Sequence, residues 1–168
     1  MDPILEICLH MAETSNCAKK QFGAVLVDTI RGIIVGKGAN KRNLLLSKLG
    51  VCEGPCVRME IQSRTESHIG ACQHAEEIAI MDALKSAFSL NYFPSLEMYV
   101  ACKKPDSLEA CEERPPNFSC IRCANLMYIL GISSVSVWSA EGWRRWAIPR
   151  ALQQAYKYAI GEDSVDIS

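Results

Sequence analysis

Residues 74–88 read HAEEIAIMDALKSAF and carry a strong helical periodicity. Alanines recur at every fourth position: Ala75, Ala79, Ala83 and Ala87. Ile80, Leu84 and Phe88 form a second apolar stripe with the same spacing. The pattern predicts a helix over Ala75–Phe88 that is apolar on most sides, so we expect it to be sandwiched between other elements rather than exposed.

Strand and helix patterns alternate on both sides of this segment. Before it we predict a helix from Asp2-Pro3 to about Ser15-Asn16, then strands over Ala24–Val27 and Ile33–Gly38 joined as a hairpin by a turn over Asp28–Gly32. After it we predict strands over Met98–Cys102 and Val135–Trp138, separated by a helix over Ile121–Leu130 that ends at Gly131. The last predicted elements are a helix over Pro149–Ile160, with an inner stripe of Leu152, Ala155, Tyr156, Ala159 and Ile160, and an edge strand or frayed tail over Val165–Ile167.

This order predicts an α/β fold in which helices pack on a mixed sheet. The strands Met98–Cys102 and Val135–Trp138 should be parallel, because a helix joins them. The length of 168 residues corresponds to a single domain over residues 1–168. Lys and Arg number 18 and Asp and Glu number 19, which gives a net charge of −1. That balance argues against a protein held on nucleic acid by bulk charge, although a local basic groove stays open.

The chain shows no pattern of a membrane or secreted protein. Its longest apolar runs, Ala24–Val27 and Ile33–Val35, are far too short to span a bilayer. Asp2 and Glu6 stand near the N-terminus without an early Lys or Arg, which is unlike a secretory signal. The nine cysteines are an odd number, so a complete disulfide framework cannot account for them. We therefore expect a reducing, cytoplasmic location and cysteines used for metal binding or catalysis.

Two short motifs, each at the start of a predicted helix, carry the chemistry. His74-Ala75-Glu76 opens one helix and Cys120-Ile121-Arg122-Cys123 opens the other. One imidazole nitrogen and two thiolates are three of the four ligands that zinc prefers, and a fourth position left for water is typical of a catalytic site. Zinc lowers the pKa of that water to about 7. Glu76 cannot comfortably bind the same metal but can reach its water as a proton carrier.

The pair of motifs resembles the zinc-dependent cytidine and deoxycytidylate deaminase family. The similarity extends over segments that follow the family order: Cys17–Val27, Gly36–Asn40, His74–Asp82, Met98–Ala101 and Cys120–Val137. A Cys/His-rich insert over residues 40–73 is most similar to the deoxycytidylate deaminases. The resemblance implies a three-layer α/β/α fold with a mixed sheet of four to five strands. It also implies hydrolytic deamination of a cytosine nucleotide, dCMP to dUMP, by an enzyme that forms homo-oligomers.

The resemblance also implies roles for individual residues. His74, Cys120 and Cys123 would hold zinc, while Glu76 would take a proton from the water, pass it to ring N3 and finally protonate the leaving ammonia. Asn40 matches an asparagine that contacts the sugar, although on sequence alone a plain turn residue after a strand is the simpler interpretation. The backbone N–H of Ala75 and the carbonyl of Ser119 match groups that hold the polar edge of the base. A structural zinc knot with Glu76 as surface charge is disfavoured, because such knots usually have four protein ligands.

The insert suggests a second metal site. Matching the deoxycytidylate deaminase motifs gives a closed set of four ligands for structural zinc: Cys17, Cys52, His68 and Cys72. Cys56 could replace one of the four, and buried free thiols are the alternative. A second zinc would order residues 40–73, because the free energy of metal binding is folding free energy.

Two features depart from the family pattern. Ser119 stands where the family usually has proline, so the rigid φ of proline is lost. Residues 102–118 (CKKPDSLEACEERPPNF) form a long loop that we expect at the mouth of the site, as a lid or specificity element or as an oligomer contact. Its cysteines, Cys102 and Cys111, are interpreted as ordinary thiols.

The remaining candidate contacts are aromatic and basic. Trp138 ends a strand near the site and is expected to flank the base, whereas Trp143 and Trp146 are better explained as anchors in a core or subunit contact. A substrate phosphate would meet Lys19, Lys20, Arg42 or Arg58. The alternative functions are deamination of another nucleobase, nucleoside or single-stranded nucleic acid, and a catalytically inactive zinc-binding regulatory subunit.

Overall fold

A five-stranded mixed sheet forms the centre of the computed structural model, which describes residues 2–43, 48, 56, 72–86, 95–104, 109–111 and 118–162. The elements are α1 (Pro3–Glu13), β1 (Gln21–Asp28), β2 (Ile33–Ala39), α3 (Ala75–Lys85), β3 (Leu96–Lys103), α4 (Ile121–Leu130), β4 (Ser134–Ser139), β5 (Gly142–Ala147) and α5 (Ile148–Ala159). The strand order is β2-β1-β3-β4-β5. β3 and β4 are parallel, as predicted, and the other neighbouring pairs are antiparallel.

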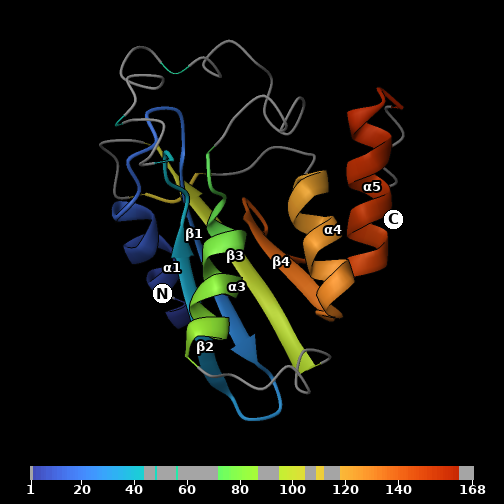
Figure 1. Cartoon of the computed structure of the whole chain (residues 1–168), viewed down its shortest axis with the longest axis horizontal. Helices are drawn as coiled ribbons and strands as arrows, with labels where there is room; N and C mark the ends of the chain where they lie inside the picture. Colours follow the sequence, from blue (N-terminus) through green and yellow to red (C-terminus); the bar gives the residue numbers. More distant parts are fainter. Residues whose placement is uncertain are drawn as a thin grey trace.

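The helices cover both faces of the sheet, which confirms the predicted three-layer α/β/α arrangement (Figure 1). α1 packs on one face through a small cluster that includes Leu5 and Cys8, and α3, α4 and α5 pack on the other around the larger core. Glycines set the distances between the sheet and two of these helices, α1 and α3. A Cβ on Gly23 would overlap the Cys8 carbonyl of α1, and a Cβ on Gly38 would overlap the Ala75 carbonyl of α3. The N-terminus of α3 is therefore seated directly on β2.

Several predicted boundaries are confirmed. Asp2 is the N-cap of α1, where its carboxylate accepts hydrogen bonds from the Ile4 and Leu5 amides. Gly131 ends α4 with a φ of 73°, in the left-handed region that favours glycine. Phe88, most of residues 40–73 and the tail at Val165–Ile167 lie outside the described residues. None of the described helices has the length and apolar character needed to cross a bilayer.

Two parts of the C-terminal region differ from the prediction. β5 was not expected, because its sequence Trp143-Arg144-Arg145-Trp146 has no alternation of apolar and polar residues. Each tryptophan packs on a different face of the sheet: Trp143 lies against Tyr99 and Trp138, and Trp146 lies against Phe118. Both act as packing anchors, as predicted.

The predicted inner stripe of α5 is wrong at three positions. Tyr156 and Ile160 are 55% and 51% exposed, and Ala159 is also exposed. Ala155 is buried as predicted, and the other buried residues of the helix are Ile148, Ala151 and Gln154. The helix begins at Ile148, one residue before the proline. Ile148, Ala151 and Ala155 recur at helical spacing, so they form the face that packs on the core.

Candidate metal and active site

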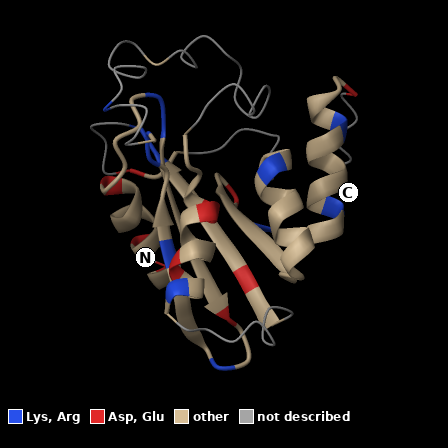
Figure 2. Cartoon of the chain, in the orientation of Figure 1, with Lys and Arg blue, Asp and Glu red and all other residues tan. Residues whose placement is uncertain are grey.

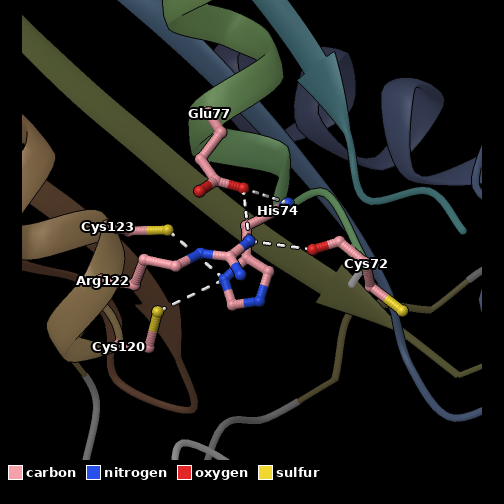
Figure 3. A network of polar contacts seen from close by, with 6 residues as sticks. All are labelled: Cys72, His74, Glu77, Cys120, Arg122 and Cys123. Atoms are coloured by element: carbon pink, nitrogen blue, oxygen red, sulfur yellow. Dashed lines mark hydrogen bonds and ion pairs between the residues drawn. The ribbon is translucent and has the colours of Figure 1, made fainter. Parts of the chain in front are cut away.

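Two helix N-termini bring the predicted zinc ligands together. His74 is the N-cap of α3 and Cys120 is the N-cap of α4, both with extended backbone. Nδ1 of His74 lies 3.3 Å from Sγ of Cys120 and 3.3 Å from Sγ of Cys123. The three side chains point toward one another from the two helices, with their ligand atoms all within 4.8 Å (Figure 3). Among the described residues, this is the group that could hold a metal ion.

The donor set fits zinc. One nitrogen and two sulfurs match the soft, tetrahedral preference of Zn²⁺ and leave one position for water. The hydrogen bond from Cys123, with further help from His74, outweighs burial and lowers the pKa of Cys120 to about 4. The same hydrogen bond, together with burial, raises the pKa of Cys123. Zinc binds thiolates, so the lowered pKa of Cys120 favours the metal-binding form of that ligand, and metal binding at Cys123 would release a proton.

Glu76 lies in the first turn of α3, beside this group. It is 7% exposed, and its Oε1 accepts a hydrogen bond from Oγ of Ser119 at 3.2 Å. Burial raises the pKa of Glu76, the nearby Cys120 raises it further, and His74 and Ser119 only partly oppose the shift. A carboxyl group with a raised pKa beside a metal site is suited to carrying protons at neutral pH.

A cavity opens over these groups. Its lining consists of Cys17, Lys19, Lys20, Phe22, Asn40, Cys56, Cys72, Gln73, His74, Ala75, Glu76, Val100, Phe118, Ser119, Cys120 and Val137. The predicted substrate contacts Asn40, Ala75 and Ser119 are among them. The apolar part of this lining comes from β1, β3 and β4, through Phe22, Val100 and Val137.

The prediction for Trp138 is corrected by its place in the sheet. Successive side chains of a strand point to opposite faces. Val137 lines the cavity, so Trp138 points to the α1 side, where its ring contacts Trp143 at a centroid distance of 5.2 Å. Trp138 therefore packs in the small core and does not flank the cavity.

Asn40 has a structural role as well as a place in the cavity wall. Its Oδ1 accepts hydrogen bonds from the Phe22 amide at 2.7 Å and from the Ser15 hydroxyl at 2.7 Å. Its Nδ2 donates to the Lys20 carbonyl at 2.9 Å. The side chain thus holds the segment that precedes β1, which agrees with the simpler interpretation of a turn residue. Its predicted contact with a sugar stays a prediction.

The second metal site is only partly covered by the structure. Cys17 and Cys72 line the same cavity, as does Cys56, while Cys52 and His68 lie outside the described residues. The long loop predicted at the mouth is also partly outside, although its start continues β3, with Lys103 bridged to Ala110.

A polar contact between the two ligand-bearing helices was missed at the sequence level. Arg122, between the two cysteines, donates from Nη2 to Oε2 of Glu77 at 2.6 Å and to the Cys72 carbonyl at 2.8 Å. Oε2 of Glu77 also accepts the His74 amide at 2.8 Å (Figure 3). The spacing of His74 and Glu77 is that of a capping box, which could have revealed half of this network.

Comparisons with known proteins relate the chain to one family and one fold. A family model described as the cytidine and deoxycytidylate deaminase zinc-binding region matches residues 2–139. The cytidine deaminase of Burkholderia pseudomallei is structurally similar, with a TM-score of 0.56 and 18% identity over 88% of this chain and 92% of that chain. The cytidine deaminase of Mycobacterium leprae gives a TM-score of 0.49 and 12% identity over 90% of this chain and 95% of that chain. No curated protein sequence matches the chain. At this identity the first structure supports the fold alone.

The Arg122 network generates a prediction about metal affinity. Arg122→Gln removes the guanidinium that joins α4 to Glu77 and the Cys72 carbonyl, so the ligands are held less firmly. We expect zinc affinity to fall roughly 10- to 100-fold, as for other residues that orient metal ligands. Competition with a chromophoric chelator measures this. Arg145→Gln is the matched control, because Arg145 pairs with Glu97 at 3.1 Å outside the cavity lining. Equal zinc affinity in both variants would contradict the prediction.

Proposed function

The chain belongs to the cytidine and deoxycytidylate deaminase family of zinc-dependent hydrolytic deaminases, and we propose that it acts on a cytosine nucleotide, converting dCMP to dUMP with release of ammonia. The observation that carries this proposal is a single cavity lined by two of the candidate zinc ligands, His74 and Cys120, by the buried Glu76 and by two lysines. The zinc ligands and Glu76 are suited to hydrolytic deamination, and the positive charge of the lysines favours a negatively charged substrate.

The residues of the site divide the work as follows. His74, Cys120 and Cys123 would hold zinc, which when bound acidifies water so that hydrolysis proceeds near neutral pH. Glu76 takes a proton from the water and delivers it to ring N3 as a C–O bond forms at C4. Glu76 then takes the proton of the hydroxyl group now on C4 and gives it to the amino group, so the C4–N bond breaks, the C4 carbonyl forms and ammonia leaves. The Ala75 amide and the Ser119 carbonyl would hold the polar edge of the base.

Lys19 and Lys20 support a nucleotide over a nucleoside. Both line the cavity, in the segment that Asn40 and Ser15 hold by hydrogen bonds. An ammonium group at this place can bind a phosphate, which a nucleoside lacks. Of the other predicted phosphate partners, Arg42 is not in the cavity lining and Arg58 is outside the described residues.

The distribution of charge supports a small substrate over a polymer. Basic and acidic residues are interspersed over the described part of the chain (Figure 2), and the net charge is −1. Binding of single-stranded nucleic acid usually relies on a continuous basic groove. The mononucleotide is therefore favoured.

One prediction of this proposal concerns the reaction itself. Protein shown to carry zinc should release ammonia from dCMP in a panel with dCTP, deoxycytidine, cytidine, cytosine, guanine and adenine. Glu76→Ala should lose roughly a hundredfold or more of kcat, because the proton carrier is gone while the zinc ligands remain. Turnover of a purine, or of no compound in the panel, would contradict the proposal. The first outcome would indicate another base, and the second an inactive zinc protein or a polymer substrate.

The second prediction concerns the phosphate. A Lys19→Ala, Lys20→Ala double variant should raise KM for dCMP by roughly tenfold or more, because charged hydrogen bonds are lost. Deoxycytidine turnover should not change. Lys157→Ala on α5 is the control, since Lys157 is not in the cavity lining. Equal losses for dCMP and deoxycytidine would argue against a phosphate at these lysines.

We further propose a second, structural zinc on Cys17, Cys52, His68 and Cys72, and a homo-oligomeric, cytoplasmic protein. The metal is supported by Cys17 and Cys72, which line the same cavity. Exposed Tyr128 and Ile129 on α4 support self-association.

Native mass spectrometry should detect two zinc ions per chain and more than one chain per particle. One zinc ion per chain would contradict the second site, and a monomer would contradict the oligomer.

A further inference from the structure

Ser119 occupies a special place beside the site. It lies directly before Cys120, where the family pattern usually has proline. Its side chain is 4% exposed, and its Oγ donates to Oε1 of Glu76 at 3.2 Å. The residue therefore contributes a hydroxyl group to a buried carboxylate, which a proline cannot do.

The contact matters because of what Glu76 has to do. A carboxylate has two oxygens and rotates about its terminal torsion, which is broad. A hydrogen bond at Oε1 limits that rotation and leaves Oε2 to exchange protons. Proton transfer requires heavy atoms within roughly 2.6–3.2 Å, so the orientation of the carboxylate governs its efficiency.

We propose that Ser119 is a positioning residue for Glu76, whose hydroxyl holds the carboxylate in the orientation that proton transfer requires. The inference rests on the proposed role of Glu76 as the proton carrier. It assigns this chain a side-chain contact in place of the backbone rigidity that proline gives related proteins. Ser119 acts through Glu76, and its own carbonyl keeps the separate role predicted for it toward the base.

The same chain contains a matched pair for comparison. Oγ of Ser136 on β4 donates to Oε1 of Glu97 at 2.7 Å, and these residues are 2% and 5% exposed. Neither lines the cavity. Loss of this hydroxyl also removes a hydrogen bond from a buried carboxylate, which keeps its ion pair with Arg145, and it has no connection with the proposed reaction. Ser136→Ala therefore reports what a merely structural serine does.

The test compares kcat and KM for zinc-loaded variants of measured metal content. Ser119→Ala should lower kcat for dCMP roughly 10- to 100-fold, as expected for a hydrogen bond to a charged group, with KM and zinc content near wild type. Ser119→Thr, which keeps a hydroxyl, should recover most of the loss. Ser136→Ala should keep the wild-type kcat. The inference is overturned if Ser119→Ala keeps the wild-type kcat, or if both alanine variants lose kcat equally.

A proline variant separates the hydroxyl from the backbone. Ser119→Pro restores the usual family residue and removes the hydroxyl, so it should be as slow as Ser119→Ala. A Ser119→Pro enzyme as fast as wild type would overturn the inference, because rigidity alone would then suffice.

A structural readout keeps the inference separate from the proposed function. If the wild-type protein turns over no cytosine compound, the proposed function fails. Crystal structures of zinc-loaded wild type and Ser119→Ala then decide the inference by themselves. A Glu76 carboxylate that rotates or becomes disordered in the variant would support it. A carboxylate that stays in the wild-type orientation would overturn it.

Discussion

The site depends on one geometric constraint: two helix N-termini must meet at the same end of the sheet. The position of α3 along the sheet is set by its close approach to β2, where Gly38 leaves room for the Ala75 carbonyl. The position of α4 along the sheet is set independently, because α4 lies in the crossover between the parallel strands β3 and β4. A displacement of either helix by one residue would move its ligands by about 1.5 Å along the helix axis. Packing of the chain thus assembles the His/Cys/Cys group.

The meeting of these helices concentrates negative charge in a partly buried space. Glu76 and Glu77 lie in the first turn of α3, and Cys120, whose pKa is lowered, is the N-cap of α4. Helix N-termini carry partial positive charge, which stabilises anions placed there. Arg122, which lies between the two cysteines in the sequence, adds a full positive charge and forms an ion pair with Glu77. These positive groups stabilise negative charge at the site, and a bound metal ion would stabilise it further.

Motifs that carry their chemistry in side-chain type and spacing were predictable from the sequence, and features decided by three-dimensional neighbours were not. The positions of His74 and Cys120 at helix starts were predictable, because helix capping and hydrophobic periodicity are local features of a sequence. The facing of Trp138 depends on strand register, which fixes Val137 toward the cavity. β5 was not predicted, because its two tryptophans pack on opposite faces of the sheet and its sequence lacks the alternation of apolar and polar residues that is typical of a strand. The contact between Arg122 and Glu77 joins residues 45 positions apart, and local spacing carries no information about such a pair.

The serine before Cys120 illustrates how distant packing permits a local change. A proline at this place would restrict the backbone that leads into α4. Here the preceding residue, Phe118, is fully buried and contacts Trp146 of β5 and Tyr158 of α5 at ring-centroid distances of 6.2 and 5.9 Å. The following residue is the N-cap of α4. Because both neighbours are anchored, residue 119 is held without proline, and its side chain is available for a hydrogen bond. Trp146 of β5 and Tyr158 of α5 thus support the backbone beside Cys120 through their contacts with Phe118.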